Sequence, residues 1–301
     1  MLQLKKLQSD HPMGKPSKRE KVLNWFLQNN FPSGIISFDD LVVAAARMSL
    51  GVGYSEAEKY ANRNVNSLWA NFVSMLRKES KLGINPIAHI VDEETHKIES
   101  YFSKLSRFRN KRAIRLSCRL AMRPAIYNKI ESLNDREYEA LCCLACNKLG
   151  ASNIHLTPRG NEGGIDFLAL IERPRIFPKC SGLTRFRIVG QAKKHSDPVQ
   201  VGHIRDFSDT LEDTRRHSPQ VLGHLPAWFK ESSTPIIGWM VGHRGFQGGG
   251  ESKARMNGIM LFDSRVLTEI IVLSSDIGST ECDEIVAQRM ASSCREILKN
   301  S

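Results

Sequence analysis

The sequence lacks the marks of a membrane protein and of a secreted protein. Its 301 residues include no apolar run of about 18 residues, the length at which a membrane-spanning helix becomes a candidate. The first residues, MLQLKKLQSDHPMGKPSKRE, contain no apolar segment of the kind found in a secretory signal. We therefore expect a cytoplasmic protein without membrane association.

Cysteine is scarce, and the seven cysteines are an odd number in a long chain, which favours free thiols in a reducing compartment. Cys143 and Cys146 have CxxC spacing, but no second pair follows at the spacing of metal ligands. A zinc or redox site is the less favoured interpretation for that reason. The helical pattern around the pair predicts two small buried residues on one helix face.

Several catalytic signatures are also missing. The sequence has no HExxH zinc motif, no GxSxG nucleophile motif and no dinucleotide-binding glycine pattern. The glycine-rich stretch GFQGGGESK is not followed by the GK[ST] order of a phosphate-binding loop, so we expect a flexible loop there. His195, His203 and His243 have no spacing typical of metal ligands, and we assign no zinc ion to them.

Positive charge is abundant and unevenly placed. The formal net charge is +11, and residues 1–130 contain 22 Lys and Arg against 11 Asp and Glu, whereas residues 131–301 contain 21 of each. Ser103–Ile130 has nine basic residues and no acid. Such a block favours a polyanion such as nucleic acid over the alternative of a merely solvated face. The residues expected to contact DNA in this block are Lys104, Arg107, Arg109, Lys111, Arg112, Arg115 and Arg119.

The N-terminal part of the chain shows helical patterns. Apolar spacing predicts helices over 19–29, 38–48 and 55–80, the last with a break near Asn64. Residues 1–88 are therefore expected to form a helical domain. It is either a helix-turn-helix or winged-helix DNA-binding module, or a helical packing or oligomerisation domain. We expect residues 89–130 to be a basic helical connector.

The pattern changes to α/β after residue 130. Asn134 and Glu137 form a capping-box arrangement at the start of a helix that ends near Gly150. Buried strands are predicted over 165–171, 186–193, 235–241 and 258–262, and helices over 199–216 and 263–272. This order predicts an α/β domain with a mixed sheet over residues 131–275, followed by a C-terminal helix within 276–301.

One carboxylate stands out in this half. Asp166, in NEGGIDF, lies within an apolar strand pattern, where a charge is costly unless it is paired or binds a cation. Gln191 and Lys193, at the end of the next strand, project from one face because they are two residues apart. We predict a Mg²⁺ ion bound by Asp166, the Gln191 amide oxygen and the Ala192 carbonyl, with Lys193 activating a water. The alternative is a structural aspartate followed by solvated lysines.

Glu139 is the second candidate acid. It shares a helix flank with the buried cysteines rather than with the polar face. A carboxylate from a helix packed against the same hairpin would lie close to the site. The alternative interpretation is a partly exposed helix glutamate.

Together these segments resemble a known enzyme family. The segments, in chain order, are REYEALCCLACNKLG, NEGGIDFLA, VGQAKK, PVQVGHIRDF, WMVGHRGF and NGIMLFDSRVL. They resemble the nuclease domain of Mrr-type restriction endonucleases, which belong to the PD-(D/E)xK superfamily. The resemblance extends over about residues 133–273. It implies a restriction-endonuclease-like core with a mixed central sheet flanked by helices, preceded here by a mainly helical basic N-terminal domain.

The resemblance also implies roles for individual residues. Glu139, Asp166, Gln191 and Lys193 match the catalytic positions, with glutamine where the superfamily often has an acid. Glu162 lies where these proteins often carry a further acid. This chain departs from the family in a long hairpin that contains several basic residues, which we interpret as a DNA-facing extension. Those residues are Arg173, Arg175, Lys179, Arg185 and Arg187, and Lys194 is a further expected DNA contact.

The expected function is a metal-dependent DNA endonuclease that takes part in restriction or defence. The expected cofactor is Mg²⁺, with Mn²⁺ as a substitute, and the expected substrate is double-stranded DNA. A homodimer is expected because cleavage of both strands needs two sites. Two alternatives remain: a DNA-binding regulator or adaptor that keeps the nuclease fold without cutting, and a junction or repair nuclease.

Overall fold

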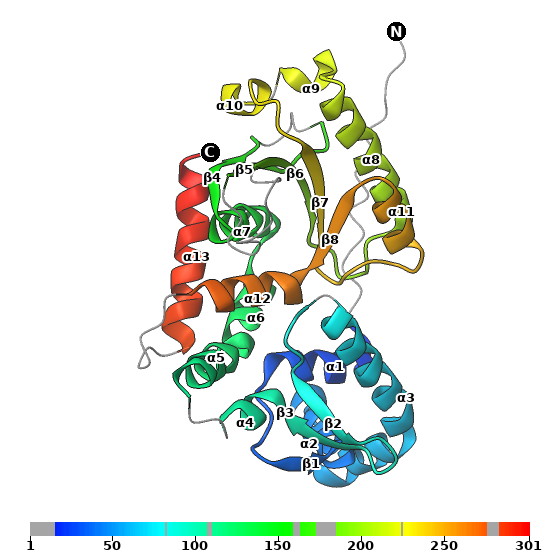
Figure 1. Ribbon diagram of the computed structural model, residues 1–301. Helices are drawn as coiled ribbons and strands as arrows, with labels where there is room; N and C mark the ends of the chain where they lie inside the picture. The colour runs from blue at the N-terminus through cyan, green and yellow to red at the C-terminus, as the bar shows by residue number, and fades with distance from the viewer. Residues whose placement is uncertain are drawn as a thin grey trace.

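The computed structural model describes residues 16–81, 83–106, 110–158, 163–172, 185–223, 225–275 and 283–301. Two bodies follow one another along the chain and lie one above the other in Figure 1. We name residues 16–100 the N-terminal module and residues 101–301 the C-terminal module. Within the described residues, no helix is both long enough and apolar enough to cross a membrane.

The N-terminal module combines three helices with a small sheet. Its elements are α1 (Lys18–Gln28), β1 (Ile35–Ser37), α2 (Phe38–Leu50), α3 (Tyr54–Lys81), β2 (Ala88–Asp92) and β3 (Lys97–Ser100). The strands pair antiparallel in the order β1-β3-β2. Phe26, Phe38 and Phe72 form the centre of its core, with ring centroids 5.0–5.6 Å apart.

Local sequence explains where these helices begin and end. Ser17 and Glu20 form a capping box at the start of α1. Gly51 ends α2 in the left-handed conformation, with φ 66°, and only Val52 and Gly53 follow before α3 begins. The expected break in α3 near Asn64 is wrong. The helix is continuous there, and the Asn64 side chain donates to the carbonyl of Tyr60, one turn earlier.

The expected helical connector over 89–130 begins instead with strands β2 and β3. Asp92 explains the turn between them, because its carboxylate accepts hydrogen bonds from the backbone of Glu94 and Thr95. Ile98 is fully buried and Ile90 lies opposite it, so the hairpin completes the core of the N-terminal module. The rest of the connector is helical, with α4 (Tyr101–Ser106), α5 (Lys111–Ala121) and α6 (Arg123–Ser132).

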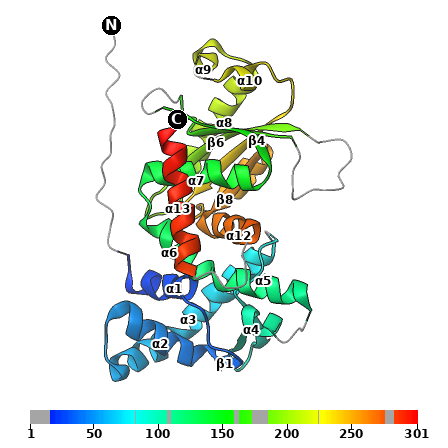
Figure 2. The ribbon, with the colours of Figure 1, turned by 90° about the vertical axis from the view of Figure 1, so that its left-hand side faces the viewer.

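A five-stranded mixed sheet forms the centre of the C-terminal module (Figures 1 and 2). Its strands are β4 (Ala151–Leu156), β5 (Phe167–Ile171), β6 (Phe186–Lys193), β7 (Ile236–Gly242) and β8 (Ile259–Asp263). Neighbours are antiparallel from β4 to β6 and parallel from β6 to β8. The predicted α/β class with a mixed sheet is confirmed, whereas β4 was not expected from the sequence.

Helices cover both faces of this sheet. The helices are α7 (Asp135–Lys148), α8 (Val201–Arg215), α9 (Pro219–Leu222), α10 (Ala227–Lys230), α11 (Gly250–Met256), α12 (Ser264–Ser274) and α13 (Asp283–Lys299). One core cluster joins α7, α12 and α13 to one face, and a second joins α8, α10 and α11 to the other. The predicted capping box of α7 is present. Helix α11 begins at Gly250, so only the last four residues of the glycine-rich stretch 245–253, which was expected to be a loop, are helical.

Polar side chains connect the two modules. The contacts include Asn24 with Arg244, Lys78 with Glu251, Glu79 with Arg265, and Asn85 with Glu269. Two of them come from the last turn of α3, so the C-terminal end of this helix lies against the C-terminal module. Glu79 is the most buried of the acids involved, with 2% of its surface exposed.

The stability of the protein is predicted to depend on pH through Glu79. Burial raises the pKa of Glu79 to about 7, although Arg265 and Arg123 act in the opposite direction. Because the folded-state pKa is above the unfolded value, this contribution is fully present below about pH 4.5 and is lost as the pH rises through 7. Glu79→Gln, which stays neutral, should therefore gain on the order of 3 kcal/mol over the wild type between pH 4 and pH 8.

Thermal or denaturant unfolding of both proteins across this pH range measures the difference. Glu93→Gln is the control, because Glu93 is an exposed carboxylate of the same module whose partner, Arg77, is also exposed. Parallel pH profiles for Glu79→Gln and the wild type would contradict the prediction.

Candidate active site

Asp166 lies where the β5 and β6 strands meet. Its backbone N–H donates to the Gly190 carbonyl at 2.9 Å, which extends the β5–β6 pairing by one residue. Its carboxylate Oδ2 accepts a hydrogen bond from the Ala192 N–H at 2.7 Å. Asp166 and Gln191 are 6% and 8% exposed. The structure therefore brings Asp166 to the end of β6, as its place in the strand pattern suggested.

A glycine explains this close approach. Phe167 and Gly190 are partners in the β5–β6 register. A Cβ added at Gly190 would lie 2.0 Å from Cζ of the Phe167 ring. The ring therefore occupies the space above Gly190 that any side chain would need. This contact fixes the register, and the register places Asp166 beside Ala192.

The two glycines of NEGGIDF have a local role. Gly163 and Gly164 have φ values of 49° and 84°, a left-handed conformation that glycine adopts at little cost. The Gly163 carbonyl accepts a hydrogen bond from the Thr210 hydroxyl of α8. The Gly164 carbonyl accepts one from Gln191 Nε2 at 2.9 Å. This bond uses the nitrogen of the Gln191 amide, so it does not occupy the amide oxygen.

The backbone of β6 presents a further oxygen to the site. The Lys193 carbonyl accepts from the His243 N–H on the β7 side, whereas the Gly190 carbonyl accepts from Asp166 on the β5 side. Carbonyls alternate in direction along a strand. The Ala192 carbonyl therefore points toward the β5 side, where the Asp166 carboxylate lies. Lys193 is half-buried and its side chain shares a strand face with Gln191.

Glu139 is held near this group by an arginine. Arg136, one turn earlier on α7, forms an ion pair with Glu139 at 2.5 Å and donates to the Thr157 carbonyl. Thr157 in turn donates through its backbone N–H to the Asp166 carbonyl. Burial raises the pKa of the Cys142 thiol, and the nearby Cys143, Cys146, Asp166 and Glu139 act in the same direction.

These donors suit a hard divalent cation better than zinc. Among the residues that the structure describes, no three or more His, Cys, Asp or Glu side chains are grouped as metal ligands. The oxygens near Asp166 are its carboxylate, the Ala192 carbonyl and the Gln191 amide. Such a set fits Mg²⁺, which takes oxygen ligands and retains several waters. Because Asp166 is the one carboxylate in this set of oxygens, we expect the affinity for Mg²⁺ to be modest.

The buried cysteines have a structural place. Cys143 and Cys146 are fully buried on α7, in the core cluster that joins this helix to the sheet. The prediction that they are small core residues is confirmed.

The predicted DNA-contacting residues divide into three groups. Lys104, Lys111, Arg112 and Arg115 are exposed and Arg119 is half-buried. Arg107, Arg109, Arg173 and Arg175, together with Glu162 and Lys179, lie outside the described residues. The third group consists of Arg185, Arg187 and Lys194, whose side chains have partners within the protein.

These partners change the interpretation of two residues. Arg187 is 4% exposed and donates to the carbonyls of Phe229 and Thr234, so it is a structural residue and does not face DNA. The ammonium group of Lys194 donates to the carbonyls of Glu131 and Leu133 at the end of α6. Lys194 is therefore a structural residue rather than the DNA contact expected from the sequence. Arg185 is exposed and paired with Glu172.

Sequence reasoning missed some residues around the site. Arg136, Thr157 and Thr210 support the acids and the glycine turn through contacts with carbonyl oxygens. Only Arg136 gave a signal that was available in advance, because it lies three residues before Glu139 on a helix. The hydroxyl contacts depend on tertiary packing and have no sequence signature.

Gly190→Ala is predicted to disrupt the site. The new methyl group would displace the Phe167 ring and shift β5 against β6, so we expect a loss of about 1–3 kcal/mol or more in unfolding free energy. Binding of Mn²⁺, followed by paramagnetic broadening, should weaken in parallel because Asp166 moves away from Ala192. Gly202→Ala on α8 is the matched control, because a Cβ there meets nothing within 4 Å. A Gly190→Ala protein with unchanged stability and Mn²⁺ binding would contradict this account.

Part of the chain is similar to known restriction endonucleases. Residues 130–221 match the Mrr catalytic-domain family model, described as a restriction endonuclease. None of the curated proteins matches the chain. A solved structure of the MspJI restriction endonuclease in complex with a 27-mer oligonucleotide shows 15% identity and a TM-score of 0.35. The similarity covers 61% of this chain and 39% of that one. The family match confirms that residues 130–221 resemble the Mrr-type restriction endonuclease domain.

Proposed function

We propose that this protein is a Mg²⁺-dependent DNA endonuclease that acts in restriction of foreign DNA. The observation that supports it best is the Asp166 carboxylate bonded to the Ala192 backbone, between Gln191 and Lys193. This group lies inside the region that matches a restriction endonuclease family. Phosphodiester hydrolysis needs an oxygen-rich cation site and a base or orienting group for water. Asp166, Gln191 and Ala192 offer the oxygens, and Lys193 offers the group for the water.

Each residue of the site has a proposed role. Asp166, the Ala192 carbonyl and the Gln191 amide oxygen would hold Mg²⁺, with Mn²⁺ as a substitute. The ion supplies Lewis-acid polarisation of the phosphate and lowers the pKa of water. Lys193 orients the attacking water through Nζ, and Nζ takes the proton of that water when the amine is neutral. Glu139, held in place by its ion pair with Arg136, is the second acid of the proposed site.

The first test is cleavage of supercoiled plasmid by the full-length protein, with Mg²⁺ or Mn²⁺ against EDTA. Methylated and unmethylated plasmids are both used. Asp166→Ala should reduce cleavage to background, because the principal ligand is lost. Lys193→Ala should slow it about 100- to 10,000-fold, the range for removal of a general acid–base group.

Glu296→Ala and Lys299→Ala on α13 are the matched controls, because both side chains are exposed and lie on another helix. Both should cut at the wild-type rate. DNA binding without cleavage on every substrate, with or without metal, would replace the nuclease with a DNA-binding regulator. Cleavage confined to branched substrates would indicate a junction nuclease.

We propose further that the N-terminal module binds DNA. Its element order is helix, strand, helix, helix, strand, strand, with sheet order β1-β3-β2, which is the arrangement of a winged-helix module. Helices α2 and α3 are joined by the three residues 51–53, as in a helix-turn-helix. In such modules the second helix lies in the major groove and its N-terminal residues contact base edges.

The N-terminal half of α3 carries suitable side chains. Lys59, Asn62, Arg63 and Asn66 are exposed and lie at helical spacing on one side. Asparagine pairs with adenine and arginine with guanine through two hydrogen bonds. The β2–β3 turn is less suitable, because it carries the acids Glu93 and Glu94, which repel phosphate.

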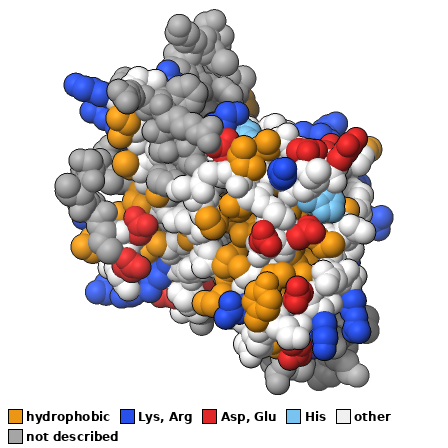
Figure 3. Space-filling model, turned by 90° about the horizontal axis from the view of Figure 1, so that it is seen from below, with side chains coloured by type: hydrophobic (Ala, Val, Ile, Leu, Met, Phe, Trp, Pro, Cys, Tyr) orange, Lys and Arg blue, Asp and Glu red, His pale blue; other side chains and the backbone are white. Residues whose placement is uncertain are grey.

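The surface charge of this end of the molecule is mixed. Seen from below in Figure 3, basic side chains lie mainly toward the edges, with acidic and hydrophobic ones across the middle. Ile35 and Tyr54 are among the exposed apolar residues, at 56% and 60%. The affinity proposed for this face therefore depends on a helix in the groove, supported by the exposed basic residues of α5, rather than on one continuous basic patch.

Two kinds of α3 variant should behave differently. Arg63→Ala should cost about 1–3 kcal/mol for the preferred sequence and little for other sequences, because it removes a base contact. Lys59→Ala should weaken binding to all sequences and reduce the salt slope by about 1, because it removes a phosphate contact. Lys299→Ala is the control. Binding titrations at several salt concentrations measure these effects, and unchanged affinity in both variants would exclude α3 as the contact helix.

We also propose that cleavage of both strands requires two copies of the chain, because each copy has a single site of this kind among its described residues. The measurement is the dependence of double-strand cleavage rate on protein concentration.

A further inference from the structure

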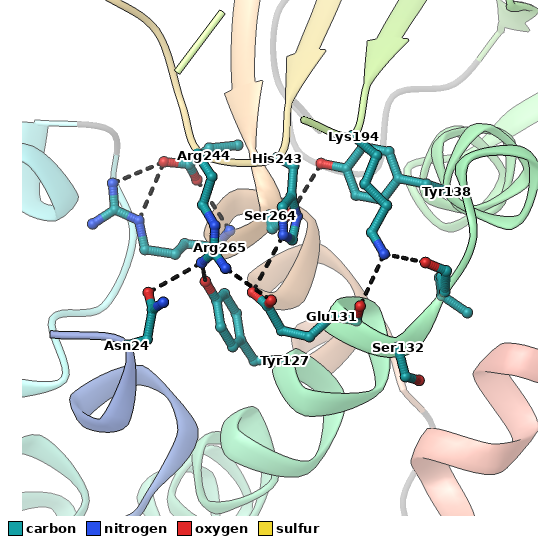
Figure 4. Close-up of polar contacts among 12 residues, drawn as sticks. Asn24, Tyr127, Glu131, Ser132, Tyr138, Lys194, His243, Arg244, Ser264 and Arg265 are labelled. Carbon is teal, nitrogen blue, oxygen red and sulfur yellow. Dashed lines mark hydrogen bonds and ion pairs between the residues drawn. The ribbon is translucent and has the colours of Figure 1, made fainter. Parts of the chain in front are cut away.

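A partly buried carboxylate connects the end of β6 to the N-terminal module. Glu131 lies near the end of α6, and its side chain is 20% exposed. Its Oε2 accepts a hydrogen bond from Arg244 at 3.0 Å, and its Oε1 lies 3.4 Å from Nε2 of His243. Figure 4 shows that the side chains of His243 and Arg244, which follow β7, converge on the carboxylate that extends from α6. We name Glu131, His243 and Arg244 the junction cluster.

The junction cluster contacts the backbone of β6 at Lys193. His243 donates its backbone N–H to the Lys193 carbonyl at 2.9 Å. The His243 ring is fixed on its other side, because Nδ1 lies 2.7 Å from the Ser264 hydroxyl. On the far side of Lys193, the Lys194 ammonium group donates to the Glu131 carbonyl at 2.9 Å. Glu131 therefore contacts His243, which donates to the Lys193 carbonyl, and also Lys194, which follows Lys193 in the chain.

The junction cluster also reaches the N-terminal module. Arg244 Nη1 donates to Oδ1 of Asn24 on α1 at 3.0 Å and to the Tyr127 hydroxyl at 3.3 Å. Arg244 therefore connects α1 to Glu131 through one guanidinium group. A planar group that donates in several directions fixes all its acceptors relative to one another.

The charges in the cluster favour a rigid arrangement. Burial acts to raise the pKa of Glu131, but His243 and Arg244 more than offset it and the pKa is lowered. The carboxylate therefore remains ionised at neutral pH and keeps its contacts. Removal of one partner would leave a partly buried charge without compensation, which is costly.

We propose that Glu131, His243 and Arg244 are positioning residues for Lys193, and that the Asn24–Arg244 contact makes the position of Lys193 depend on docking of the N-terminal module. In such a nuclease, Lys193 is in position to orient water only while the N-terminal module is docked. The consequences for cleavage rest on the proposed function, whereas the structural coupling does not.

The chain offers a matched control for this proposal. Asn85, also in the N-terminal module, donates to Glu269 at 2.6 Å, and Glu269 is paired with Arg123 at 2.5 Å. This contact resembles that of Asn24, since an asparagine of one module meets a charged side chain of the other. Within the described part of the chain, the hydrogen bonds and ion pairs of Asn85 and Glu269 do not involve β6 or His243.

The experiment compares Asn24→Ala with Asn85→Ala in the full-length protein. The first readout is amide hydrogen exchange of the β7 end, residues 239–246, which includes the His243 amide that bonds to Lys193. Asn24→Ala should raise exchange there at least several-fold, and Asn85→Ala should leave it at the wild-type level. Equal exchange in the two variants and the wild type would overturn the coupling.

The second readout is cleavage kinetics. Asn24→Ala should lower kcat about tenfold with unchanged DNA affinity and unchanged midpoint of thermal unfolding, whereas Asn85→Ala should leave kcat unaltered. A loss of DNA affinity or a similar loss of kcat in both variants would show a general docking effect and overturn the positioning role. In a double-mutant cycle, Asn24→Ala and Arg244→Ala should be non-additive in kcat. Arg244→Lys should not restore the rate, because lysine cannot bridge Asn24 and Glu131 with a planar group.

These outcomes separate the two proposals. If the wild type cuts no DNA but hydrogen exchange responds to Asn24→Ala alone, the nuclease proposal fails and the coupling stands. If the wild type cuts and exchange does not respond, the coupling fails and the nuclease stands.

Discussion

The contact between the Phe167 ring and Gly190 is the constraint on which the site depends. It fixes the register of β5 against β6, and the register alone decides what Asp166 faces. A slip of one residue would move Gln191 and Lys193 to the opposite face of the sheet. The carboxylate would then lose the Ala192 N–H that holds it. A packing contact with no chemistry of its own therefore determines the geometry of the polar groups.

The sequence predicted the sheet of the C-terminal module well where strands are buried on both sides. β5 and β7 are apolar runs bounded by turn residues, and short runs of this kind are readily assigned to buried strands. β4 was missed because it is an edge strand whose residues are mostly exposed or half-buried, so its apolar signal is weak. β1 was missed because it has three residues. Short and edge strands depend on their partners, and partners are not visible in a local pattern.

The candidate site also contains residues that were predictable from the sequence and residues that were not. Asp166 and the pair of residues two apart on β6 were predictable, since strand periodicity and the cost of a buried charge apply locally. The roles of Lys194 and Arg187 were not predictable, because a basic residue looks like a surface residue until the carbonyl groups around it are known. The same holds for Arg244, whose contact with Asn24 joins residues 220 positions apart.

The candidate site has few acidic side chains, and the placement of Lys193 by the junction cluster therefore matters more. One carboxylate is bonded to a backbone N–H and the other is paired with Arg136, so little negative charge is left to define a cation position. Where electrostatics are weak, placement of the remaining groups carries more of the catalytic effect, because a displacement of about 1 Å can cost a factor of about 100 in rate. Lys193 is the group whose placement matters most in this scheme. Its backbone is tied to α6 and β7, and through Arg244 to α1, so a site of this composition gains its order from the docking of the two modules.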